Sequence, residues 1–150
     1  MFTVFGFVTK RDDLTSAEFI DYYENHHVPL ILSLAPAPAV YKRHYVCHGD
    51  ELNVADSSFD FDAVTEQQFA SRSEFTAWIT AVTSGSAGER VAADEAQFLD
   101  RARTRACVAA THESSCAAST SRDGVFSVGA TGTSVEPPMN TTSDTIRPPR

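Results

Sequence analysis

The stretch "FTVFGFVT" at residues 2–9 decides the fold. It is rich in β-branched and aromatic residues and the polar turn "KRDDLT" follows it, so it is predicted to be a β-strand. Successive side chains of a strand point to opposite faces, and both faces of this one are apolar. The two sets are Phe2, Val4 and Val8, and Phe5 and Phe7. Such a strand fits the middle of a sheet that is covered on both sides.

Helix and strand patterns alternate along the rest of residues 1–112. The segment "TSAEFIDYYENHHVPLILSLA" begins with the capping-box pair Thr15 and Glu18 and repeats apolar residues at helical spacing. Ser71 and Glu74 repeat the capping-box spacing in front of a second helix. The other predicted elements are strands at residues 40–48, 59–69 and 104–111 and a short helix at residues 89–100.

The predicted order of elements is β, α, β, β, α and β, with one small extra helix. This order is typical of the α+β class and of the ferredoxin-like split βαβ layout, an antiparallel four-stranded sheet with its helices on one face. The other face would expose a contiguous aromatic patch, larger than soluble monomers usually tolerate. We therefore expect a second copy of the same sheet to cover it, in a homodimer that forms a dimeric α/β barrel.

The chain has the length of one ordinary domain, which we expect to span residues 1–112. From Glu113 the sequence becomes rich in Ser, Thr and Pro and contains a single aromatic residue, Phe126. Such a segment cannot bury enough apolar surface to offset its conformational entropy. Residues 113–150 are therefore predicted to form a disordered tail, which can also host phosphorylation or a partner motif.

The composition argues against several classes of function. The formal net charge is −8 and no cluster of Lys or Arg interrupts it, so a nucleic-acid partner is not expected. No apolar run of membrane-spanning length and no signal-peptide pattern is present, which favours a cytoplasmic protein without membrane contact. Three widely spaced cysteines, without a CxxC pair, do not predict disulfides or a zinc site. Phosphate-binding glycine loops and nucleophile elbows are also missing, and no cofactor is expected.

Two adjacent histidines in the first predicted helix have different surroundings. His27 falls inside the apolar stripe and should face the sheet, whereas His26 lies at the edge of the stripe. Pro29 lacks an amide proton and disfavours helix just before it, so we expect a bend around residues 26–28 that frees carbonyl groups near the imidazoles. His27 is therefore either a general acid or base, or a core histidine that pairs with a freed carbonyl.

The predicted strand at residues 59–69 carries carboxylates on one face, among them Asp62 and Glu66. If this face turns toward the helices, either carboxylate can orient His27 or exchange a proton with it, and we take His27, Asp62 and Glu66 as candidate catalytic residues. If it turns away, they are interface or solvent groups. The histidines and carboxylates show no HxH or HxxxH spacing, so a metal site is not expected.

The pattern of the predicted strand at residues 40–48 also does not determine which of its faces turns toward a cavity. One face carries Tyr41, Arg43 and Tyr45, and the other carries Lys42, His44 and His48. Either set can supply a phenol or an imidazole to a cavity, and an edge strand with one wet face explains the same pattern.

Residues 1–112 resemble the EthD domain proteins of the dimeric α/β-barrel superfamily. The resemblance rests on "KRDDLTSAEFIDYYENHHVPL", with its H-x-P-L from His27 to Leu30, on "YKRHYV" and "DFDAVTE" for the second and third strands, and on "ADEAQFLD" before the last strand. It implies the ferredoxin-like fold, a barrel-forming dimer, a cavity between each sheet and its helices, and a role for His27 rather than His26. The chain departs from the usual pattern at His44 and at residues 67–68.

The resemblance also implies a class of activity, because relatives include fungal decarboxylases and dehydratases of aromatic polyketide pathways. We expect a cofactor-free lyase or isomerase of secondary metabolism that acts on an aromatic or polyketide-like small molecule. One alternative is a cofactor-independent monooxygenase acting on a phenol or anthrone, and another is a non-catalytic binder of small ligands. The expected substrate-binding residues are Tyr23, His26, His44, Tyr45, Trp78 and Phe98.

Overall fold

The computed structural model describes residues 1–114. Its strands are β1 (Phe2–Val8), β2 (Val40–Tyr45), β3 (Ala63–Phe69) and β4 (Arg105–Ala109). Its helical segments are α1 (Ser16–Tyr22), the π-helical turn η1 (Tyr23–His27), α2 (Val28–Leu34), the 3-10 turn η2 (Asp56–Ser58), α3 (Arg72–Thr83) and α4 (Gly85–Phe98). The predicted tail at residues 113–150 lies outside the described residues, apart from its first two.

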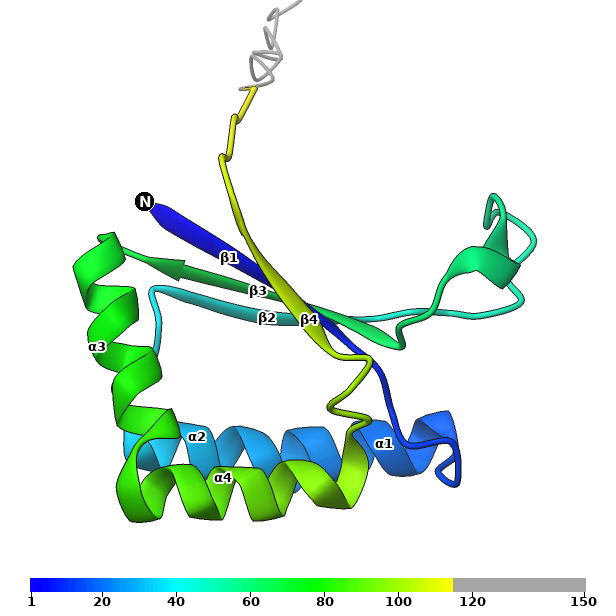
Figure 1. The fold of residues 1–150 in the computed structure, drawn as a ribbon. Helices are drawn as coiled ribbons and strands as arrows, with labels where there is room; N and C mark the ends of the chain where they lie inside the picture. Colours follow the sequence, from blue (N-terminus) through cyan, green and yellow to red (C-terminus); the bar gives the residue numbers. More distant parts are fainter. Residues whose placement is uncertain (115–150) are drawn as a thin grey trace, which may run out of the picture. The chain divides into compact units, whose positions relative to one another are not determined.

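The four strands form one antiparallel sheet in the order β2-β3-β1-β4. β1 lies between β3 and β4, which confirms the central position predicted from its two apolar faces. The helices lie on one side of the sheet, with α4 running alongside α2 and α3 leading to them from the end of β3 (Figure 1). This is the ferredoxin-like α+β arrangement that the element order predicts.

Several elements differ in length from their predicted bounds. β3 starts at Ala63 rather than at Phe59, and β2 ends at Tyr45. The predicted short helix is the 14-residue α4, the longest in the described part of the chain. A single residue, Ser84, separates α3 from α4, and the positive φ of Gly85 (57°) lets the chain turn there.

The capping boxes are confirmed in one case and changed in the other. The amide of Thr15 donates to the Glu18 carboxylate (2.8 Å), and the amide of Glu18 donates to the Thr15 hydroxyl (3.2 Å). At α3 the amide of Glu74 donates to the Ser71 hydroxyl (3.2 Å), but the Glu74 carboxylate accepts from the amide of Ala70 (2.6 Å). The second box therefore closes one residue earlier than the sequence predicts.

The first predicted helix is interrupted where Pro29 requires it. Residues 23–27 form a π-helical turn, and the amide of Val28 donates to the carbonyl of Tyr23, five residues back. A π-turn inserts one extra residue into the helix, and α2 then starts with Pro29 in its first turn, where a missing amide proton costs little. The expected bend is therefore a π-bulge, and it determines which way His27 points.

The strand register separates two sets of side chains on the sheet. Val8 pairs with Ala63 on the face covered by the helices, where both are buried. Phe5 pairs with Glu66 and Cys107 on the open face. The other residues in register on the open face are Thr3, Phe7, Val40, Lys42, His44, Val64, Gln68, Arg105 and Ala109. The open face thus carries charged groups beside Phe5 and Phe7, and the ring of Phe7 lies 5.2 Å from that of Phe61, which in turn lies 6.0 Å from Phe59. The aromatic residues predicted for this face are therefore present, together with charged side chains.

The core consists of two clusters between the sheet and the helices. The first contains Phe19, Tyr23 and Phe98, and the second contains Phe69 and Trp78. In the part of the chain that the structure describes, no helix has both the length and the apolarity needed to span a membrane.

Candidate active site

His27 points into the helical layer and is 7% exposed. It occupies the last position of η1, so the extra residue of the π-turn sets the direction of its imidazole. His26, its neighbour, is exposed and stacks on the ring of Tyr22, with centroids 4.8 Å apart. The prediction that the two histidines have different surroundings, with His27 buried, is confirmed, but the partner of the imidazole lies on α4 rather than on the sheet.

Asp94 of α4 is the partner of His27. The Nδ1 nitrogen of His27 lies 2.6 Å from Oδ2 of Asp94, and the two side chains are only 8% and 12% exposed. An ionised carboxylate can only accept hydrogen bonds, so Nδ1 carries the proton in neutral imidazole. The lone pair is then on Nε2, which has no hydrogen-bond partner among residues 1–114. This arrangement leaves Nε2 free to accept a proton.

Tyr22 fixes the other oxygen of the same carboxylate. Its hydroxyl donates to Oδ1 of Asp94 at 3.0 Å. Burial raises the pKa of Tyr22, and the hydrogen bond to the Asp94 carboxylate raises it further. Tyr22 therefore stays a hydrogen-bond donor over the whole physiological range, and it holds Asp94 in the orientation that His27 needs.

Aromatic rings enclose the imidazole of His27. The ring of Phe98 lies 5.0 Å from it and the ring of Tyr23 lies 5.2 Å from it, centroid to centroid. Burial raises the pKa of Tyr23 well above its usual value, so this phenol is neutral. The pair of His27 and Asp94 therefore lies in an apolar environment, where electrostatic interactions are stronger than in water.

A second polar cluster follows on the same side of the sheet. The Glu24 carboxylate accepts from Nε (3.0 Å) and Nη2 (2.7 Å) of Arg43 and from the hydroxyl of Tyr45 (2.6 Å). These hydrogen bonds from Arg43 lower the pKa of Glu24. The Arg43 guanidinium also lies over the ring of Tyr41 at 4.8 Å, and burial raises the pKa of Tyr41 to about 12. The set with Tyr41, Arg43 and Tyr45 is therefore the one that faces the helices.

Neither Asp62 nor Glu66 contacts His27, so the predicted pairing was wrong. Oδ2 of Asp62 accepts from the amide of Lys10 (2.9 Å), and its Oδ1 lies 3.4 Å from Nε2 of His48. Glu66 lies on the open face, 3.6 Å from Nε2 of His44. β3 turns its smaller and less polar residues, such as Ala63, toward the helices, because charged groups on that face would lose their hydration.

The predicted substrate-binding residues lie in different parts of the structure. Tyr23 and Phe98 contact His27, and Tyr45 lies 6.2 Å from the ring of Tyr23. His44 lies on the open face. Trp78 belongs to the second core cluster and lines a cavity of about 390 Å³ whose walls do not include His27. The structure thus places Tyr23 and Phe98 against His27 and Tyr45 against Tyr23, whereas the side chains of His26, His44 and Trp78 do not contact the imidazole of His27.

Three residues of the site, Asp94, Tyr22 and Glu24, were not predicted from the sequence. Asp94 lies in the segment "ADEAQFLD", three residues after the buried Val91 and four before the buried Phe98, so helical spacing places all three on one face of α4. This spacing is the signal that could have identified it. Among residues 1–114, no three His, Cys, Asp or Glu side chains lie close enough together to hold a metal ion.

Comparison with known proteins gives one family match. A model of the EthD domain matches residues 11–102. Among solved structures, a protein from Arabidopsis thaliana has a TM-score of 0.52 at 10% identity, covering 77% of this chain and 100% of that one. An EthD family protein from Bacillus halodurans has a TM-score of 0.51 at 15% identity, covering 75% and 100%. No curated protein matches the chain. At these identities the two structures show the fold alone.

Proposed function

The chain belongs to the EthD domain family, and we propose that it is a cofactor-free lyase or isomerase that acts on an aromatic or polyketide-like small molecule. His27 is the general base and acid, and Asp94 takes the orienting role that was predicted for Asp62 or Glu66. The observation that carries it is the buried contact of 2.6 Å between Nδ1 of His27 and Asp94, with Nε2 left unpaired.

The chemistry follows from the protonation states of this pair. Neutral His27 takes a proton at Nε2 from an acidic C–H or O–H of the substrate, and Asp94 stabilises the imidazolium that forms. The same Nε2–H then returns the proton to another atom of the substrate. A shift of a double bond, loss of water and protonation of a ring carbon after loss of carbon dioxide all need only this exchange.

The surrounding side chains favour an aromatic substrate. The rings of Tyr23 and Phe98 pack next to the imidazole inside the first core cluster, and the aromatic contacts continue to Phe19. These three rings are buried, so a substrate that reaches Nε2 enters aromatic surroundings, where a planar ring packs well in offset or edge-on arrangements. The hydroxyls of Tyr22 and Tyr45 are engaged by Asp94 and Glu24 and hold those carboxylates in place.

The direct test is His27→Gln with His26→Gln as the matched control. Both variants exchange an imidazole for an amide in the same π-turn, but only His27 contacts Asp94. With a panel of phenolic acids and aromatic β-ketones as substrates, we expect turnover to fall about 10²- to 10⁴-fold in His27→Gln, the usual contribution of positioned acid–base catalysis. His26→Gln should stay near the wild-type rate, and circular dichroism should show both variants folded. Unchanged turnover in a folded His27→Gln contradicts the assignment.

Oxygen consumption separates the lyase or isomerase from the alternative monooxygenase. The same base can form an oxidisable phenolate or carbanion, so His27→Gln would lose activity in either case. We expect turnover to continue under anaerobic conditions. During aerobic turnover, an oxygen electrode should record no consumption of oxygen. Substrate-dependent oxygen uptake would favour the monooxygenase. Binding of every candidate without any conversion would instead favour a small-ligand binder.

A further inference from the structure

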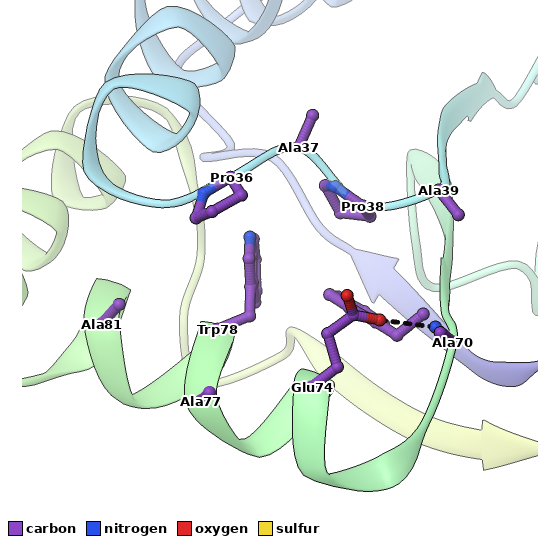
Figure 2. A pocket seen from close by; sticks show the side chains of 10 residues that line it. Pro36, Ala37, Pro38, Ala39, Ala70, Glu74, Ala77, Trp78 and Ala81 are labelled. Carbon is purple, nitrogen blue, oxygen red and sulfur yellow. Dashed lines mark hydrogen bonds between the residues drawn. The ribbon is translucent and has the colours of Figure 1, made fainter.

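A cavity of about 390 Å³ opens between α3 and the linker that joins α2 to β2. Figure 2 shows Trp78 rising from α3 toward this linker, where Pro36 and Pro38 lie opposite it. Five of the lining residues are alanines, so no long side chain fills the space. The volume lies within the range of roughly 300 to 1,000 Å³ that is common for small-molecule sites.

The indole N–H of Trp78 is buried and has no hydrogen-bond partner. Among the described residues, its Nε1 is the one buried side-chain nitrogen or oxygen left unpaired, and the residue is only 9% exposed. Figure 2 shows this nitrogen at the end of the ring that is directed at the linker wall of the cavity. Buried donors are almost always satisfied in folded proteins, because an unpaired one has lost its bond to water without replacement. A partner for Nε1 would have to be a hydrogen-bond acceptor that reaches it from the cavity.

The linker can admit such an acceptor. Pro36 and Pro38 have no amide proton, and the structure records no hydrogen bond between the segment from Pro36 to Pro38 and any other described residue. This wall is held by packing contacts alone, so a small outward movement exposes Nε1 without breaking a hydrogen bond. The fixed φ angles of the two prolines limit how much conformational freedom a ligand must remove.

The walls restrict the class of ligand. Phe69 and Trp78, with ring centroids 5.6 Å apart, give the cavity aromatic surfaces, and the alanines and prolines are apolar. Glu74 is the only charged residue of the lining, and its carboxylate accepts from the amide of Ala70. A negatively charged ligand would be repelled by Glu74, and a strongly polar one would lose its hydration.

We propose that this cavity is a binding site for a neutral ring compound that carries one hydrogen-bond acceptor, such as an aromatic ketone, with its oxygen accepting from Nε1–H of Trp78. The site is separate from the pair of His27 and Asp94, because His27 does not line it. The proposal does not rest on the proposed catalytic function, and its test measures binding rather than turnover.

The test compares two probe molecules of similar shape, only one of which carries a hydrogen-bond acceptor. 1-Tetralone has a carbonyl oxygen where 1-methylenetetralin has a CH₂ group of similar shape. Trp78 is the single tryptophan of the chain, so its fluorescence reports binding directly, and calorimetry gives the dissociation constants. We expect the ketone to bind the full chain about 3- to 10-fold more tightly than the hydrocarbon, the range that one net hydrogen bond supports. In Trp78→Phe, followed by calorimetry, the two probes should bind equally.

Two further variants test the location. Ala77 lines the cavity and is exposed, so Ala77→Phe should fill its opening and abolish binding of both probes without disturbing the core. Thr76→Phe, one residue earlier on the same helix and outside the lining, should leave the affinities unchanged. Absence of binding in the full chain, equal affinity for the two probes, or retained binding in Ala77→Phe would each overturn the proposal.

Discussion

Nδ1 of His27 lies 2.6 Å from Oδ2 of Asp94, a residue 67 positions further along the chain. The contact joins the π-turn of the first helical segment to α4. It assigns the proton of neutral His27 to Nδ1 and leaves Nε2 as the basic nitrogen.

Asp94→Asn should reduce turnover strongly while the fold is kept. An amide has a donor group that can bond to Nδ1, which moves the imidazole proton to Nε2 and removes the base. We expect a loss of about 10²- to 10⁴-fold in kcat with circular dichroism unchanged. Asp21→Asn, which replaces an exposed carboxylate on α1, is the control and should retain activity. Equal turnover in Asp94→Asn and wild type would refute the role of Asp94.

Tyr22→Phe should have a smaller effect, because Tyr22 acts only through Asp94. The ring and its stacking with Phe98 (5.1 Å) remain, and only the hydrogen bond to Oδ1 of Asp94 is lost. We expect kcat to fall about 2- to 10-fold, which corresponds to one net hydrogen bond. In a background of Asp94→Asn the same substitution should cost nothing more, because its target is already altered. An additive loss in the double variant would show that Tyr22 acts independently of Asp94.

Glu24→Gln should destabilise the protein in a way that depends on pH. The hydrogen bonds from Arg43 hold the pKa of Glu24 below its usual value of 4.5, so the folded state favours the ionised form. The resulting stability is fully present above pH 4.5 and is lost as the pH falls through the lowered pKa. Glu24 is 34% exposed, so solvent screens its ion pair. We therefore expect Glu24→Gln to lower the free energy of unfolding by only about 1–2 kcal/mol at neutral pH.

Urea denaturation of wild type and Glu24→Gln at several pH values measures this difference. The gap between their free energies of unfolding should be largest at neutral pH and should close in acid. Asp13→Asn removes the exposed ion pair with Arg11 and serves as the control, with little effect expected. If the difference in free energy of unfolding between wild type and Glu24→Gln stays constant from neutral to acidic pH, the ion pair between Glu24 and Arg43 does not cause it.

The open face of the sheet should be the interface of a homodimer. Cys107 and Val108 are neighbours on β4, both exposed, and they point to opposite faces, with Cys107 in register with Phe5 on the open face. Light scattering should return a dimer mass for the full chain and for residues 1–112. Cys107→Arg should shift the protein to a monomer, because it places a second large cation two residues from Arg105 and in register with Phe5, whereas Val108→Arg should remain a dimer.

A monomer mass for the wild-type chain at micromolar concentration would refute the arrangement of sheet against sheet. Dissociation by Val108→Arg but not by Cys107→Arg would place the interface on the opposite face of β4.

The sequence by itself determined the elements, their order and the inward direction of His27. These features depend on local rules, since hydrophobic periodicity defines each helix and strand, capping residues start the helices, and Pro29 enforces an interruption. The central position of β1 followed from its two apolar faces.

Only the tertiary structure decided the partner of His27 and the direction of β3. Alternation divides the residues of a strand into two sets, but the packing of the whole sheet determines which set is buried. The alternation of this strand was therefore predicted correctly, but the set of residues that contains Asp62 and Glu66 faces away from the helices. Asp94 reaches His27 because α4 packs against the π-turn through Phe98, a contact between segments that no local pattern connects. The side-chain period of a strand or helix is a local property, whereas the choice of face and partner depends on the burial of apolar surface over the entire fold.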